Sequence, residues 1–192
     1  MEQLLLVSFA YLLGSVLFGD VIARLRDVDL RRVGSGNVGA TNTARVLGKK
    51  AGVLVFLLDM LKGFIPVSLA LNCCGAESYT VALVGIASVV GHVFPLFYRW
   101  KGGKGVATAF GVVLAISLWH AFILLLLWAG VLYWKRYVSL ASITACSFAP
   151  VLFLASGYPF HLFLMSAIVS ALIILKHRPN INRLLKGEEL KV

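Results

Sequence analysis

Long apolar runs alternate with short polar segments along the chain. Several runs approach or exceed the roughly 18 apolar residues that indicate a transmembrane helix. Seven spans fit this pattern, at residues 4–23, 51–72, 79–98, 105–118, 119–134, 137–156 and 159–176. Connections between them are brief, and no change of composition marks a second domain. The pattern therefore predicts an all-α polytopic membrane protein, with residues 1–192 forming a single integral-membrane domain.

The segment from Gly105 to Trp134 is ambiguous, because it could be one over-long helix or two short ones broken near Trp119–His120. The distribution of basic residues favours two. With seven spans and the N-terminus outside, seventeen of the eighteen Lys and Arg residues lie on one side, and Lys62 lies within a span. We therefore expect an outer N-terminus and a cytoplasmic C-terminus.

Composition supports the membrane assignment and limits the possible partners. Hydrophobic residues make up 60% of the chain and charged residues 14%, with a mean hydropathy of +0.92. A soluble domain of this size cannot bury so much apolar surface. The formal charge of +10 would suggest nucleic acid in a soluble protein. Here topology and anionic lipid headgroups explain it, so we expect membrane lipid as a partner and no nucleic acid.

A glycine-rich polar run, Gly34–Arg45, separates the first two spans. Its glycines allow positive φ, so successive N–H groups could surround one anion. Arg45 offers a planar fork suited to phosphate. The neutral hydrogen-bonding side chains of the run are those of Ser35, Asn37, Thr41 and Asn42. The alternative is a hairpin whose basic residues serve only topology.

A second glycine segment, Lys101–Gly105, follows the third span. Gly102 and Gly103 free the backbone beside Lys104, and the next helix is expected to begin at once. The first N–H groups of that helix favour an anion. His92, in the preceding span, could support this segment. A turn with two lysines that fix topology is the alternative.

The chain beyond the last span is polar. His177 has the reference pKa nearest neutrality among the groups expected at this face, and Asn180 can bind hydroxyl groups or orient a neighbour. An amphipathic tail in the lipid headgroups is the alternative.

Two acidic residues lie within or beside predicted spans. Asp59 and Lys62 are three residues apart and therefore share one helix face. A charge inside a membrane is functional by default, but we favour a structural pair that braces the polar segments from below. Asp20, at the inner end of the first span, is a candidate for holding a basic loop residue.

These polar segments together resemble the bacterial membrane acyl-phosphate–glycerol-3-phosphate acyltransferases over nearly the whole chain. The motifs that carry the resemblance are Gly34-Ser-Gly-Asn-Val-Gly-Ala-Thr-Asn-Thr-Ala-Arg45, Gly91-His-Val-Phe-Pro95 with Lys101-Gly-Gly-Lys-Gly-Val-Ala-Thr108, and His177-x-x-Asn180-Ile-x-Arg183. They stand in the family's order and between the expected spans. Trp100 replaces the more usual phenylalanine, a departure that puts nothing in doubt.

The resemblance implies transfer of a fatty acyl group from acyl phosphate to the 1-hydroxyl of glycerol 3-phosphate. The products would be lysophosphatidic acid and phosphate, in the first committed step of phospholipid synthesis. It also implies that neither acyl carrier protein nor coenzyme A is the direct donor. The site would face the cytoplasm from a bacterial cytoplasmic (inner) membrane.

Because acyl phosphate is already an activated anhydride, positioning and charge stabilisation could supply most of the rate. We expect direct attack without an acyl-enzyme, with Lys104 and Arg45 holding phosphates and His177 orienting glycerol 3-phosphate. Whether His177 or the leaving phosphate takes the proton stays open. The other expected substrate contacts are Ser35, Gly36, Asn37, Thr41, Asn42, Gly102, Gly103, Ser142 and Asn180.

Three other classes of protein fit less well. A phosphate transporter should place its cations near the membrane midplane, often within an inverted repeat that this sequence lacks. A lipid-binding scaffold would explain the charge bias but not two glycine segments. A CDP-alcohol phosphotransferase would need spaced metal-binding aspartates, so we expect no metal and no cofactor.

Overall fold

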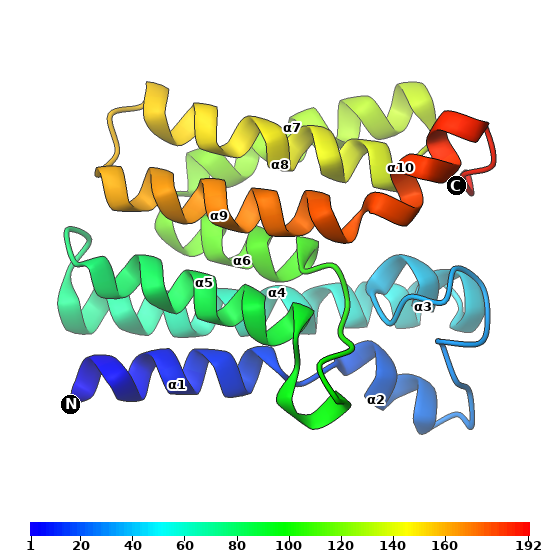
Figure 1. Cartoon of the computed structure of the whole chain (residues 1–192), viewed down its shortest axis with the longest axis horizontal. Coiled ribbons are helices and arrows are strands. Elements are labelled where there is room, and N and C mark those ends of the chain that lie inside the picture. Colours follow the sequence, from blue (N-terminus) through cyan, green and yellow to red (C-terminus); the bar gives the residue numbers. More distant parts are fainter. The chain divides into compact units, whose positions relative to one another are not determined.

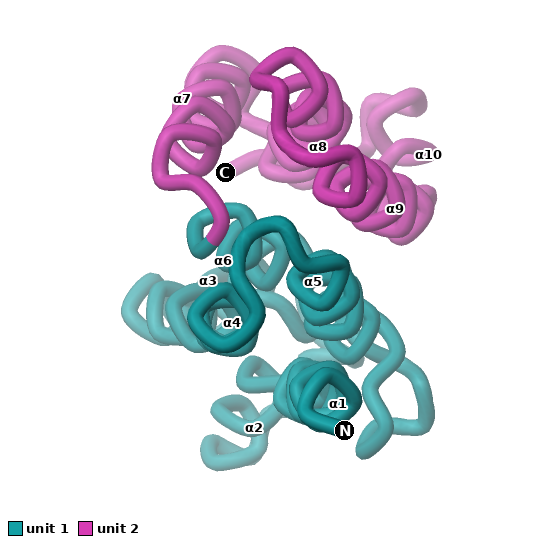
Figure 2. Tube along the Cα trace, turned by 90° about the vertical axis from the view of Figure 1, so that its left-hand side faces the viewer, with its two compact units in different colours: residues 1–115 teal, residues 116–192 magenta.

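The computed structural model describes residues 1–192 and is entirely helical, as the sequence predicts. The chain forms two compact units, Met1–Ala115 and Ile116–Val192 (Figures 1 and 2). That both units form a single domain stays a prediction.

Three long helices form the centre of unit 1. α1 (Glu2–Gly14), α4 (Lys49–Cys74) and α5 (Tyr79–Val93) pack against one another, and Figure 2 shows them nearly end-on. The shorter elements of this unit are α2 (Phe18–Arg24), α3 (Ala40–Leu47), the 3₁₀ turn η1 (Leu96–Tyr98) and α6 (Val106–Ile116).

Glycines allow the helices of unit 1 to pack closely. A Cβ atom on Gly14 of α1 would overlap the carbonyl oxygen of Ser88 in α5, and one on Gly91 would overlap that of Tyr11. In the same way, Gly63 lies against the Thr108 carbonyl where α4 meets α6. Small residues permit such backbone contact between membrane helices, where packing rather than hydrophobicity drives association.

The first apolar segment is broken between α1 and α2 by Ser15–Leu17. The Ser15 hydroxyl donates to the Tyr11 carbonyl at 2.8 Å and accepts from the backbone N–H of Leu96 at 3.3 Å. Lys62 Nζ donates to the Val16 carbonyl at 2.6 Å. Backbone polar groups within a membrane protein must find partners internally, and these contacts supply them at the break.

Unit 2 consists of α7 (Leu118–Lys135), α8 (Val138–Ala155), α9 (Phe160–Lys176) and α10 (Arg178–Lys186). α8 contacts both α7 and α9, and α10 packs on α8 and α9. The axes of α9 and α10 differ by 55°. Pro179, in the first turn of α10, suits a helix start because it needs no hydrogen-bond donor there.

Five helical segments are long and apolar enough to cross a membrane, and the bent pair α9–α10 makes a sixth. The predicted break within residues 105–134 is confirmed. It falls at Ser117, whose hydroxyl accepts from the backbone N–H of His120 at 3.3 Å. α6 has 11 residues and is about 16 Å long, roughly half the apolar thickness of a bilayer. Seven crossings and the orientation of the termini stay predictions.

Candidate functional site

The first glycine segment is part loop and part helix. Gly34 and Gly36 have φ of +62° and +73°, so positive φ is confirmed at both. At Gly39 that expectation is wrong, because its φ is −86° and it caps α3 in an extended conformation. The expected loop therefore ends there, and Thr41, Asn42 and Arg45 lie on α3.

Asn42 gives the loop its shape. Its side chain is buried, and its amide oxygen accepts from the backbone N–H of Ser35 at 2.7 Å. Its amide nitrogen donates to the carbonyls of Leu30 and Val33, at 3.2 and 3.0 Å. Both polar ends of Asn42 thus bind the protein's own backbone. We assign it a positioning role beneath the loop, while its expected contact with substrate stays a prediction.

The other polar side chains of this segment are more accessible. Ser35, Asn37 and Thr41 are half-buried, and Arg45 is exposed on α3. Because α3 begins directly after the loop, its first N–H groups add to the anion-attracting character of the segment.

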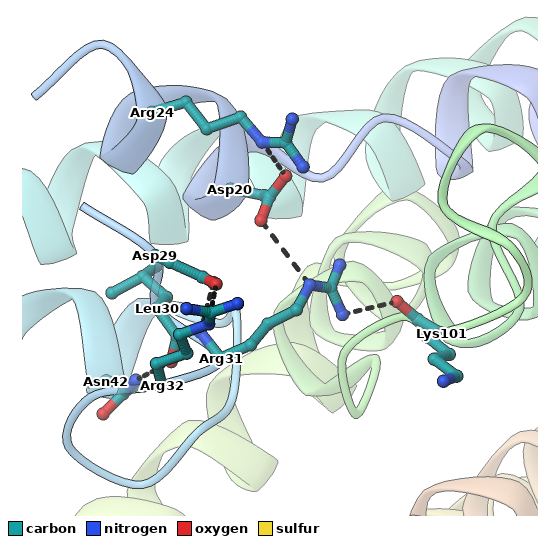
Figure 3. Close-up of polar contacts among 8 residues, drawn as sticks. All are labelled: Asp20, Arg24, Asp29, Leu30, Arg31, Arg32, Asn42 and Lys101. Carbon is teal, nitrogen blue, oxygen red and sulfur yellow. Dashed lines mark hydrogen bonds and ion pairs between the residues drawn. The ribbon is translucent and has the colours of Figure 1, made fainter. Parts of the chain in front are cut away.

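Arg31, three residues before the first glycine segment, contacts the second one (Figure 3). Its guanidinium donates to the Lys101 carbonyl at 3.0 Å and lies 3.7 Å from the buried carboxylate of Asp20. Because Arg31 lies in a turn, this ion pair confirms the expectation that Asp20 holds a basic loop residue. Asp20 also accepts from Arg24 of α2 at 2.7 Å. Sequence reasoning counted Arg31 only among the cations that set topology.

The second glycine segment lies against His92. The Gly103 N–H donates to the His92 carbonyl at 3.1 Å. A Cβ on Gly102 would overlap that carbonyl oxygen, and one on Gly103 would overlap His92 Nε2. The predicted support by His92 is confirmed. Half-buried Lys104 follows, and α6 begins at Val106, as expected from the sequence.

Beneath this segment lies a buried charged cluster. Lys62 Nζ is 3.0 Å from Asp59 Oδ1, which confirms the expected pair, and the same carboxylate oxygen is 3.8 Å from His92 Nδ1. All three side chains are less than 5% exposed.

In unit 2, His177 lies at the junction of α9 and α10 and is buried. Its Nδ1 is 2.8 Å from the Ile173 carbonyl. A carbonyl oxygen only accepts, so Nδ1 carries the proton and donates this bond. In a neutral ring with this tautomer, Nε2 is an acceptor, the form needed to receive a proton or a hydroxyl hydrogen bond.

Glu189 holds the C-terminal segment to the rest of unit 2. Its carboxylate accepts from Asn180 at 2.6 Å, from Arg183 at 2.7 Å and from Ser139 at 2.8 Å. Burial acts to raise the pKa of Glu189, but these hydrogen bonds outweigh it and hold the pKa below its ordinary value. Sequence reasoning missed Glu189, because no motif close to it in the sequence marks it as important.

Ser142 connects two helices of unit 2. Its hydroxyl donates to the Val138 carbonyl at 2.8 Å and accepts from Trp128 Nε1 at 3.2 Å. The geometry gives it a local role between α7 and α8, and a contact with substrate stays a prediction.

Comparison with known proteins shows the family. Residues 4–187 match the family model described as glycerol-3-phosphate acyltransferase. The chain belongs to this family. The relative from Aquifex aeolicus (strain VF5), described as glycerol-3-phosphate acyltransferase, is 58% identical over 98% of both chains. A relative of the same description from Hydrogenobaculum sp. (strain Y04AAS1) is 46% identical over 97% of this chain and 95% of its own.

Two crystal structures of the integral membrane glycerol 3-phosphate acyltransferase PlsY have the same fold as this family member. The glycerol 3-phosphate form is 56% identical, with a TM-score of 0.99 over 100% of this chain and 96% of its own. The lysophosphatidic acid form is 55% identical, with a TM-score of 0.95 over 100% and 95%.

The expected site residues of this acyltransferase-family chain divide between the two units. The site residues from Ser35 to Lys104 belong to unit 1, where Arg31, just before the first segment, contacts the second. Ser142, His177 and Asn180 belong to unit 2, where Glu189 binds Asn180 directly.

The Glu189 contacts predict a pH-dependent contribution to stability. We expect Glu189→Gln to lower the free energy of unfolding by about 1–2 kcal/mol at pH 7, because charged hydrogen bonds are lost. Since the folded pKa lies below the unfolded one, the contribution is complete above the unfolded pKa and disappears as pH falls through the folded pKa. Thermal unfolding in detergent at pH 7 and at progressively lower pH would measure it.

Glu188→Gln is the matched control, because Glu188 is exposed and its backbone contact does not involve the side chain. Equal melting temperatures for Glu189→Gln and Glu188→Gln at pH 7 would contradict the assignment.

Proposed function

We propose that this protein transfers a fatty acyl group from acyl phosphate to the 1-hydroxyl of glycerol 3-phosphate. The products are lysophosphatidic acid and phosphate. Family membership over residues 4–187 supports the reaction class. The likeness to PlsY in its glycerol 3-phosphate and lysophosphatidic acid forms supports the acceptor and the product.

The observation that carries the proposal is the contact of Arg31 with Lys101, because it links the turn just before the first glycine segment to the second glycine segment within unit 1. Both substrates carry a phosphate, so the reaction needs two anion sites close together. One segment offers Ser35, Gly36, Asn37, Thr41 and Arg45, and the other offers Gly102, Gly103 and Lys104. Their glycines allow a phosphate to approach the backbone closely.

The reaction proceeds by direct attack. The 1-hydroxyl oxygen of glycerol 3-phosphate bonds to the acyl carbon, and the bond from that carbon to the phosphate oxygen breaks. Phosphate leaves with the electron pair, and the hydroxyl proton passes to it or to Nε2 of His177. Lys104 and Arg45 offset the negative charge that develops as the anhydride opens.

In unit 2, His177 and Asn180 orient glycerol 3-phosphate. With Nδ1 donating to Ile173, a neutral His177 ring has Nε2 as an acceptor, and Glu189 fixes Asn180 by accepting from its amide nitrogen. Ser142 adds a further substrate contact. Fixed polar groups lower the barrier because little reorganisation is needed during the reaction.

The acyl chain lies in the bilayer, among the apolar helices. Acyl phosphate therefore reaches the site without first entering water, a step that costs about 0.8 kcal/mol for each exposed CH₂ group. The protein works in a bacterial cytoplasmic membrane with its site on the cytoplasmic side. It uses acyl phosphate directly, without acyl carrier protein or coenzyme A as donor.

The test is phosphate release by purified protein in detergent or a lipidic phase, with palmitoyl phosphate and EDTA present. We expect release only when glycerol 3-phosphate is added, together with lysophosphatidic acid. Activity that survives EDTA would show that no added divalent metal is required. Palmitoyl coenzyme A in place of palmitoyl phosphate should give no product.

Absence of release from a folded sample would overturn the proposal, and counterflow of glycerol 3-phosphate in vesicles would then test transport. Trapping of a radiolabelled acyl-enzyme after quenching would contradict direct attack while leaving the overall reaction in place.

A further inference from the structure

We infer that Asp59, Lys62 and His92 act together as positioning residues that hold Lys101–Gly105 in the conformation in which Lys104 binds phosphate. This inference rests on the role of Lys104 in the proposed function. None of the three is proposed to touch substrate. They act through the backbone of the second glycine segment.

The cluster is anchored at the break between α1 and α2. Lys62 lies in the middle of α4 and is 1% exposed, yet its ammonium group reaches the Val16 carbonyl at 2.6 Å. Burying an ammonium group is costly unless it is paired and hydrogen-bonded. Asp59 at 3.0 Å supplies the countercharge, so the pair is fixed at both ends.

Asp59 connects this anchor to His92. Its Oδ1 atom faces Lys62 on one side and His92 Nδ1, at 3.8 Å, on the other. His92 Nδ1 is buried and makes no hydrogen bond within the chain. Buried polar atoms without a hydrogen bond are uncommon and call for an explanation. Packing against the glycine segment holds the His92 ring in a position where Nδ1 stays 3.8 Å from Asp59, too far for a hydrogen bond.

His92 passes this constraint to the residue before Lys104. Its carbonyl accepts from the Gly103 N–H at 3.1 Å, and its ring Nε2 fills the space where a Cβ of Gly103 would stand. Two different atoms of one buried residue therefore fix a single glycine. A rotation of the His92 ring would displace the Gly103 backbone and with it Lys104.

The segment is also held from its other end, at Lys101, by Arg31. Arg31 in turn lies against Asp20, four residues after Val16. The contacts that hold the two ends of the segment, through His92 and through Arg31, therefore both connect it to residues near the α1–α2 break. Residues 101–105 have no regular secondary structure, so these contacts take the place of a helix in setting where Lys104 lies.

A purely structural cluster would serve only to satisfy the Val16 carbonyl. Removing it would then lower the melting temperature without loosening residues 101–105 and without changing kcat per folded molecule. Positioning predicts a local change at this segment and a fall in kcat. The two roles therefore differ in what can be measured.

The test combines hydrogen–deuterium exchange with steady-state kinetics on the full chain. The variants are Asp59→Asn, His92→Gln and the double variant Asp59→Asn/Lys62→Met. We expect amide exchange in residues 101–105 to accelerate at least about tenfold, and kcat to fall at least about tenfold, because a misplaced catalytic group loses rate steeply. Exchange in α9, in unit 2, should be unchanged.

His120→Gln is the matched control, since His120 is a buried histidine of unit 2 that packs on Phe153 and Tyr158. It should alter neither exchange at 101–105 nor kcat. The double variant removes both charges, so we expect it to stay folded even if Asp59→Asn alone does not. Wild-type exchange at 101–105 and wild-type kcat in the folded double variant and in His92→Gln would overturn the inference.

Exchange does not depend on activity. If wild-type protein lacks acyltransferase activity, the proposed function fails while the exchange result still decides whether the cluster holds the segment.

Discussion

Replacing Lys104 by alanine is expected to lower kcat for acyl transfer by about 10²–10³-fold, the usual cost of removing one group that stabilises transition-state charge. The reason is that, in the proposed function, the ammonium group binds a phosphate whose charge grows as the anhydride opens. Lys104 also lies in a segment whose backbone is already fixed by His92 and Arg31. Steady-state phosphate release with palmitoyl phosphate and glycerol 3-phosphate would measure the loss.

Lys101→Ala is the matched control, because Lys101 is an exposed lysine of the same segment. Its contact with Arg31 uses the backbone carbonyl, which alanine retains. Near wild-type kcat is expected for Lys101→Ala. A similar loss in both variants would mean that the segment contributes only its overall positive charge.

Removing one partner of the buried pair is expected to destabilise the fold strongly. Lys62→Met should lower the free energy of unfolding by about 3–5 kcal/mol, because it leaves the Asp59 carboxylate buried without its countercharge. The Val16 carbonyl also loses its donor. Thermal unfolding in detergent, followed by circular dichroism, would measure the effect.

The double variant Asp59→Asn/Lys62→Met should cost less than the sum of the two single variants, since no uncompensated charge remains. Additive losses in this cycle would show that the two side chains do not interact energetically.

The sequence predicted the short-range contacts of the candidate site better than the long-range ones. Two glycine segments beside cations, the Asp59–Lys62 pair and the support of Lys101–Gly105 by His92 all followed from local patterns. Each depends on residues close in sequence or on the polarity expected within a span. Such short-range relations can be recognised in a single sequence without knowledge of the fold.

Arg31 and Glu189 could not be found in the same way. Seventeen cations satisfy the topology rule equally well, and only the fold shows that Arg31 meets the backbone of Lys101, seventy residues later. Glu189 contacts Ser139 across fifty residues. Pairing over such separations depends on helix packing, which hydrophobic periodicity does not encode.

Helix boundaries were missed for a related reason. Gly39 and its polar neighbours suggested a loop through Arg45, yet Gly39 adopts an extended cap and α3 begins after it. The first turns of helices favour the same small polar residues that favour turns, so composition alone does not distinguish them.

The donor that satisfies the Val16 carbonyl lies forty-six residues further along the chain, in α4. During synthesis, the first apolar segment therefore emerges and meets the membrane before this partner exists. Until α4 inserts, nothing from that helix can satisfy the exposed carbonyl, and a continuous first helix is favoured because it satisfies its own backbone. The break between α1 and α2 would then form as a late step of assembly, when α4 packs against both helices.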